Sequence, residues 1–178
     1  MAGFSLLGLS GSLRAASHNR LLLAEAARLG AASSYAEADL RLPLYDGDLE
    51  EQSGIPAEVQ ALADAIAAAD AVVIASPEYN KGISGVLKNA LDWVSRTEGN
   101  VWADKPVAIM SATAGRAGGE RAQTMLRACI APFRARVIAG PEVLVAASYE
   151  AFDADGQLKS DLYSKALSEV MDGLKSAL

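Results

Sequence analysis

Short apolar runs alternate along this chain with segments in which apolar residues recur at helical spacing. The clearest run, AVVIAS at 71–76, is rich in β-branched residues and lacks polar alternation, as expected for a strand buried on both faces. FSLLGL at 4–9 is a similar run that ends in serine and glycine. The predicted strands, in chain order, are residues 4–9, 34–40, 71–76, 105–113 and 142–147.

Helical periodicity fills the intervals between these runs. From Ser17 the apolar positions follow a period of three to four residues, and Gly30 is typical of a helix end. The last segment, from Leu158, places its apolar residues on one side and predicts an amphipathic helix of the outer layer. The predicted helices are residues 17–29, 56–70, 84–96, 119–133 and the segment that starts at 158.

Strands that alternate with helices predict an α/β fold with a parallel sheet, because parallel neighbours need a crossover connection. We therefore expect five parallel strands with helices on both faces. The sequence contains no internal repeat, low-complexity tract or linker. Residues 1–178 are predicted to form one domain.

Composition narrows the possible partners. The chain has 178 residues, of which 51% are apolar, and a net charge of -6 from 16 basic and 22 acidic residues. No basic patch is available for nucleic acid, and no apolar stretch approaches the ~20 residues of a spanning helix. The N-terminus also lacks the pattern of a secretory signal. We expect a cytoplasmic protein with no nucleic-acid and no membrane partner.

The single cysteine and the single histidine limit the chemistry further. Cys129 has no partner for an internal disulfide and is predicted to be a small core residue. His18 alone cannot build a zinc site of the usual His/Cys kind, and no metal site is predicted. On the first turn of a helix, His18 is interpreted as a surface or packing residue rather than a catalyst.

The loop after the first strand concentrates polar donors at a helix N-terminus. Backbone N–H groups at such an end favour an anion. Ser10, Ser12 and Ser17 add hydroxyl groups, Asn19 adds an amide, and Arg14 adds a planar charged group suited to phosphate oxygens. We interpret this loop as a phosphate site. In the alternative interpretation, Ser17 only caps the helix and Arg14 is an ordinary surface charge.

Several familiar motifs are absent. The sequence contains no G-x-x-x-x-G-K-[ST], no G-x-G-x-x-G after the first strand and no G-x-S-x-G. The sequence therefore gives no support for ATP hydrolysis, for dinucleotide binding through the usual glycine fingerprint, or for serine hydrolysis. The acidic run from Asp46 does not match calcium-loop spacing and is interpreted as a solvated turn or a helix start. No catalytic side-chain nucleophile is predicted.

Three segments resemble the NAD(P)H-dependent FMN reductase family, which includes quinone, chromate and azo-dye reductases. They are GSLRAASHNRLL after the first strand, SPEYNKGISGVLKNALDW after the third and GGERAQTMLR after the fourth. The resemblance covers residues 4–147. It implies a flavodoxin-like three-layer sandwich whose five-stranded parallel sheet has the order 2-1-3-4-5, with helices on both faces.

The resemblance also implies which residues bind FMN. The phosphate would lie in the first loop, held by Ser10, Ser12, Arg14, Ser17 and Asn19. The flavin ring would lie along Pro77, Glu78, Tyr79 and Asn80, with Ser111, Thr113 and Gly115 approaching it from the loop after the fourth strand. Two positions depart from the family pattern: Ser84 stands where many relatives have a helix-start proline, and His18 stands where an aromatic residue is common.

In this family, NADPH or NADH delivers a hydride to bound FMN, which reduces quinones, azo compounds, free flavin or metal oxyanions such as chromate. The resemblance implies the same activity here, with small-molecule electron acceptors as partners and a homodimer or homotetramer as the assembly. Lys81 and Arg116 would attract the phosphates of NAD(P)H. Two other possibilities stay open from the sequence: a flavodoxin-like electron carrier and a non-enzymatic FMN-binding module.

Overall fold

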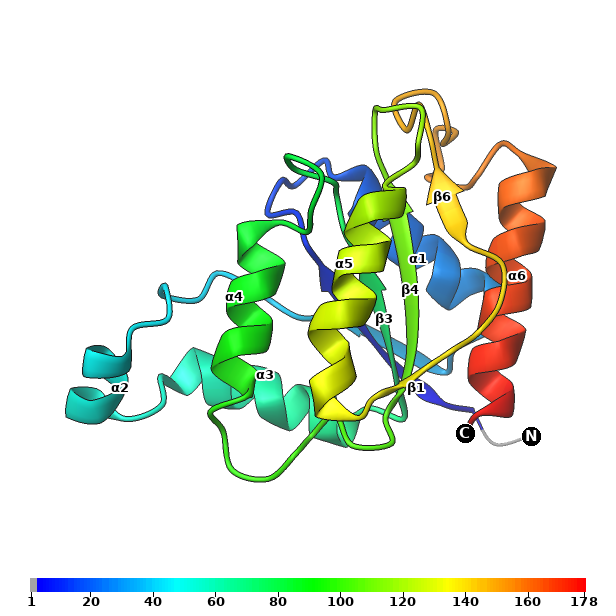
Figure 1. The fold of residues 1–178 in the computed structure, drawn as a ribbon. Helices are drawn as coiled ribbons and strands as arrows, with labels where there is room; N and C mark the ends of the chain where they lie inside the picture. Colours follow the sequence, from blue (N-terminus) through cyan, green and yellow to red (C-terminus); the bar gives the residue numbers. More distant parts are fainter. Residues whose placement is uncertain (1–2) are drawn as a thin grey trace.

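The computed structural model describes residues 3–178, and its centre is a twisted parallel sheet (Figure 1). Every strand pairing in the described part of the chain is parallel, in the order β2-β1-β3-β4-β5 with β6 also paired to β4. The predicted strand order 2-1-3-4-5 is therefore confirmed. The strands are β1 (Ser5–Ser10), β2 (Ser34–Glu37), β3 (Ala71–Ala75), β4 (Pro106–Ala112), β5 (Arg136–Val137) and β6 (Val143–Val145).

The predicted sheet differs most from the observed one at the fifth strand, and the second strand, predicted at 34–40, ends earlier, at Glu37. A single strand was expected at 142–147, whereas two short segments pair with β4. β5 pairs with its first residues, Pro106 and Val107, and β6 pairs with its last, Met110 to Ala112. Gly140 and Pro141 lie between the two segments, and proline cannot donate a ladder hydrogen bond. The edge strand is therefore interrupted here.

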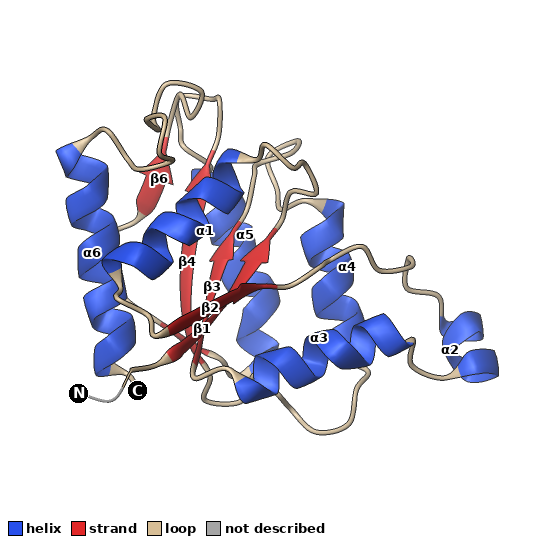
Figure 2. Cartoon of the chain, turned by 180° about the vertical axis from the view of Figure 1, so that it is seen from behind, coloured by secondary structure: helices blue, strands red, loops and turns tan. Residues whose placement is uncertain are grey.

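Helices cover both faces of the sheet, as predicted (Figures 1 and 2). α3, α4 and α5 share one hydrophobic cluster with one face, and α1 and α6 share another cluster with the opposite face. In β3, Val72 and Ile74 belong to the first cluster, while Val73 and Ala75 belong to the second. The helices are α1 (His18–Leu29), α2 (Gly47–Ser53), α3 (Ala57–Ala68), α4 (Gly85–Val94), α5 (Glu120–Ile130) and α6 (Asp161–Ser176), with a 3-10 turn at Ala131–Phe133.

α2 lies apart from both layers at the side of α4 (Figure 2). It begins in the acidic run that was interpreted as a turn or a helix start, and none of its residues is buried. Glu50 fastens it by accepting hydrogen bonds from the Arg96 Nε (3.0 and 3.1 Å) and the Tyr45 hydroxyl (3.0 Å). The Arg96 hydrogen bonds hold the pKa of the Glu50 carboxyl below its ordinary value. Tyr45 also packs edge-on against Trp93.

Cys129 and Trp93 both pack within the chain, Cys129 at the margin of the core to which it was predicted to belong. Cys129 is half-buried against the cluster under α3, α4 and α5. Trp93 is fully buried within its own chain, and its indole Nε1 donates to the carbonyl of Pro43 at 2.8 Å. No helix of residues 3–178 is both long and apolar enough to cross a membrane. The same residues contain no group of three His, Cys, Asp or Glu side chains that would hold a metal ion.

Candidate functional site

The carboxyl ends of β1, β3 and β4 deliver three loops to one cavity of about 600 Å³. This is the edge of an open parallel sheet where ligands bind. Nine of the twelve predicted cofactor residues line the cavity, and Ser10, Asn80 and Ser111 do not. The nine are Ser12, Arg14, Ser17, Asn19, Pro77, Glu78, Tyr79, Thr113 and Gly115.

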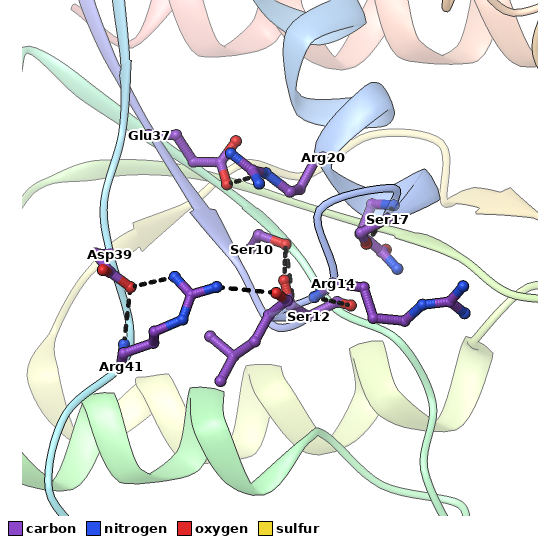
Figure 3. Close-up of polar contacts among 10 residues, drawn as sticks. Ser10, Ser12, Arg14, Ser17, Arg20, Glu37, Asp39 and Arg41 are labelled. Carbon is purple, nitrogen blue, oxygen red and sulfur yellow. Dashed lines mark hydrogen bonds and ion pairs between the residues drawn. The ribbon is translucent and has the colours of Figure 1, made fainter.

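The turn after β1 is held by its own serines (Figure 3). The Ser10 hydroxyl donates to the Ser12 carbonyl (3.1 Å) and accepts from the Ser12 backbone N–H (3.2 Å). Ser10 is 4% exposed and lies behind the turn, so its contacts shape the loop rather than face the cavity. The Arg14 side chain is exposed and forms no ion pair or hydrogen bond within residues 3–178. Its guanidinium is therefore available to an anion in the cavity.

Ser17 and Asn19, at the start of α1, form different hydrogen bonds. Ser17 is the N-cap and accepts from the Asn19 backbone N–H at 3.2 Å. The Asn19 side chain, 3% exposed, donates to the Ala112 carbonyl (2.9 Å) and accepts from the Ala112 N–H (3.0 Å). Ala112 is the last residue of β4. Asn19 therefore joins the first loop to the third while it contributes to the cavity wall.

The loop after β3 is fixed to α5 by the carboxylate of Glu78. Its Oε2 accepts from the backbone N–H groups of Arg121 (3.1 Å) and Ala122 (3.3 Å). α5 has no side-chain cap of its own, because its N-cap is Gly119, so Glu78 supplies the cap from 43 residues away. Asn80 is exposed at the tip of the short hairpin closed by Tyr79 and Gly82.

The loop after β4 depends on a buried hydroxyl. The Ser111 Oγ donates to the Gly118 carbonyl (2.6 Å) and accepts from the Gln123 Nε2 (2.8 Å). Ser111 is fully buried and supports the loop from below, whereas Thr113 and Gly115 reach the cavity wall. Gly119 has a φ of +98°, and a Cβ there would lie 2.7 Å from the Ser111 Cβ and Oγ. Only glycine fits this position.

Ser148 and Tyr149 also line the cavity and were not predicted. They belong to the irregular segment between β6 and α6, which has no pattern that marks a ligand site. The Ser148 Oγ lies 2.9 Å from the Nδ1 of His18, whose ring stacks on Phe152 with 6.0 Å between ring centroids. His18 therefore both packs, as predicted, and forms part of the cavity wall.

The chemistry of the wall fits a phosphorylated, partly apolar ligand. Arg14 and the N-terminus of α1 supply positive charge at the first loop, and the carboxylate of Glu78 is occupied by the N–H groups of α5. Pro77, Tyr79, Ala112 and Ala114 provide apolar surface along the second and third loops. A cavity of this volume accommodates a mononucleotide. The residues present therefore fit FMN.

A family model described as NADPH-dependent FMN reductase matches residues 4–150 of the sequence. The chain belongs to this family. An NAD(P)H-dependent FMN reductase from Pseudomonas aeruginosa is 40% identical over 172 residues, which cover 96% of this chain and 92% of that protein. A quinone reductase from Escherichia coli is 41% identical over 139 residues, 76% of this chain and 74% of that protein.

Solved structures agree with this assignment. FerB, a flavoenzyme NAD(P)H:(acceptor) oxidoreductase from Paracoccus denitrificans, superposes with a TM-score of 0.85 at 29% identity and covers 98% of each chain. The family resemblance, the flavodoxin-like fold and the enzyme class predicted from the sequence are thus confirmed. The reductase is an FMN-dependent oxidoreductase with NADPH or NADH as its co-substrate.

Proposed function

We propose that this reductase uses NAD(P)H to reduce quinones in the cavity formed by its first three sheet loops. The proposal rests on one observation: the turn that carries Arg14 and an apolar wall line the same cavity of about 600 Å³. FMN held there would supply the redox chemistry, which is hydride transfer from the nicotinamide and electron transfer to the second substrate. The protein binds and orients FMN and the substrates, and no side-chain nucleophile is required.

The site residues divide into those that face the ligand and those that hold the loops. Ser12, Arg14 and Ser17 would bind the phosphate through two hydroxyls and a guanidinium. The second loop, at Pro77, Glu78 and Tyr79, and the third, at Thr113 and Gly115, would flank the flavin ring, whereas Asn80 lies outside the cavity lining at the tip of its hairpin. Ser10, Asn19 and Ser111 support these loops through the hydrogen bonds described above.

Quinones are favoured as acceptors by two observations. Tyr79 and Tyr149 line the cavity with 53% and 64% of their surface exposed, so their rings are available to a planar substrate. The Escherichia coli relative at 41% identity is named a quinone reductase. Azo compounds, free flavin and chromate are further acceptors under this proposal. Lys81 and Arg116 are exposed beside the cavity loops, where they would attract the phosphates of NAD(P)H.

Turnover by the flavin-loaded protein tests the proposal. With saturating menadione, we expect rapid oxidation of NADH or NADPH measured at 340 nm, and lower rates with azo dye, chromate or free flavin. If neither nicotinamide is oxidised although FMN is bound, the protein is an electron carrier or a binding module. If the purified protein stays colourless and does not take up added FMN, the proposed site itself is wrong.

We further propose a homodimer or homotetramer that buries the segment around α2. Leu44 (81% exposed), Tyr45 (40%) and Leu49 (36%) leave an apolar patch next to α4. Light scattering is expected to give twice or four times the mass of one chain. Leu44→Glu should shift the protein towards monomers, whereas Leu162→Glu, at a similarly exposed leucine of α6 (73%), should not. A monomeric wild-type protein would contradict the proposal.

Three remaining expectations are proposals of the same kind. Residues 1–178 are proposed to be one FMN-binding domain, which is supported by the continuous sheet that runs from β2 to β5. A cytoplasmic location is supported by the use of NAD(P)H, an intracellular metabolite. The net charge of -6 supports the absence of a nucleic-acid partner.

A further inference from the structure

Arg41, which follows β2, reaches the backbone of the first cavity loop. Its Nη2 donates to the carbonyl of Leu13 at 3.1 Å, and its Nη1 donates to the Oδ1 of Asp39 at 3.1 Å (Figure 3). The Arg41 backbone N–H donates to the same Asp39 oxygen at 3.0 Å. Asp39 therefore binds both the backbone N–H and the guanidinium of Arg41, and the guanidinium points at the turn.

On the side that faces Arg41, away from the main cavity, the turn has little other support. A second cavity, of about 190 Å³, lies behind it and is lined by Leu13, Asp39 and Arg41 among others. Ser12 lines this cavity as well as the main one, so the turn separates the two cavities. Within the described residues 3–178, the bond from Arg41 is the only hydrogen bond that joins residues 12–16 to a part of the chain outside residues 10–17.

We propose that Arg41 is a positioning residue for the phosphate of FMN. This inference rests on the proposed function, since it requires that the turn from Ser12 to Ser17 binds the phosphate. By holding the Leu13 carbonyl on the far side, Arg41 keeps the neighbouring Ser12 and Arg14 directed at the main cavity. A turn that is already ordered loses less conformational entropy when the ligand binds.

This arrangement makes the effect specific to the phosphate. Riboflavin is FMN without the phosphate, so it binds through the ring and the sugar chain alone. Loss of Arg41 should weaken FMN and leave riboflavin almost unchanged. A residue that merely stabilised the fold would weaken both flavins together. The Arg41 and Asp39 side chains are 61% and 67% exposed, so replacing them is not expected to unfold the protein.

The test measures binding of FMN and riboflavin to flavin-free full-length protein by quenching of flavin fluorescence. For Arg41→Ala we expect the Kd for FMN to rise about tenfold, the effect of one lost hydrogen bond to a charged donor. The Kd for riboflavin should stay within about twofold. Arg41→Lys, which keeps a donor, should recover part of the loss.

Arg20→Ala is the matched control. Arg20 is a neighbouring arginine with a 42% exposed side chain that pairs with Glu37 at 2.7 Å and makes no hydrogen bond to the turn. It should leave both flavin affinities unchanged. Asp39→Ala should reproduce part of the Arg41→Ala effect, and the double variant should be no weaker than Arg41→Ala alone, because both residues act through one contact.

Two results would overturn the inference: an unchanged FMN affinity in Arg41→Ala, or an equal loss for FMN and riboflavin. Arg14→Ala separates this failure from failure of the proposed function. If Arg14→Ala loses FMN selectively and Arg41→Ala does not, the phosphate site stands and only the role of Arg41 is wrong. If Arg14→Ala also shows no phosphate-specific loss, the proposed site is wrong.

Discussion

Replacing Arg14 with alanine is expected to raise the Kd for FMN by roughly 10- to 100-fold, which corresponds to one charge-assisted hydrogen-bonding group. The Arg14 side chain lines the cavity and has no partner of its own within residues 3–178. Its removal takes away positive charge at the phosphate end and breaks no contact inside the protein. The melting temperature of the flavin-free protein should therefore be unchanged, and fluorescence titration with FMN measures the loss.

Arg14→Lys is the conservative variant for this experiment. It keeps the charge but loses the planar pair of donors that suits two phosphate oxygens, so an intermediate affinity is expected. Riboflavin serves as the reference ligand and should bind both variants as it binds the wild type. If FMN binds Arg14→Ala as tightly as it binds the wild type, the cationic turn is not the phosphate site.

The loops of this site could be predicted because their chemistry is local in sequence. The turn from Ser10 to Ser17 follows a strand and opens a helix, and both features are visible in the hydrophobic pattern. β3 was predicted within one residue, since all five of its residues are buried and apolar. Placing the loops together needed only the rule that parallel strands deliver their carboxyl ends to one edge.

The remaining features depend on contacts between distant residues. The partner of Asn19 is 93 residues away, and the partner of Glu78 is 43 residues away. Nothing in the local sequence shows that Glu78 caps α5. The sequence left the α2 segment open between a solvated turn and a helix start, because it has no buried face and therefore no hydrophobic periodicity. Tyr149 lines the cavity because the segment after β6 lies against the start of α1, where the neighbouring Ser148 contacts His18.

These contacts change how the family motif is understood in this chain. Asn19 and Glu78 were assigned to FMN by resemblance, yet their side chains bond to backbone groups of β4 and α5, respectively. Such residues fix the distance between loops that bind different parts of one ligand. A motif residue of this kind is expected to affect the stability of the flavin-free protein as well as flavin affinity.

Asn19→Ala is accordingly expected to lower the melting temperature of the flavin-free protein by about 5–15 °C. β3 ends at Ala75, so the edge of β4 that faces β3 leaves the N–H and C=O of Ala112 without a strand partner. The Asn19 amide bonds to both groups in the interior. Its truncation would leave two buried backbone groups unpaired, at a cost of about 1–3 kcal/mol each. Differential scanning calorimetry measures the change.

Asn19→Asp is the sharpest control, because the side chain keeps its size and exchanges the amide NH2 for a second, charged oxygen. Its carboxylate can accept from the Ala112 N–H but faces the Ala112 carbonyl with a second oxygen, so a loss similar to that of Asn19→Ala is expected. In the flavin-free protein, Ser17→Ala removes only the cap of α1 and should cost about 1 kcal/mol. If Asn19 acted as an FMN ligand alone, the flavin-free melting temperatures of Asn19→Ala and Asn19→Asp would equal that of the wild type, and only FMN affinity would fall.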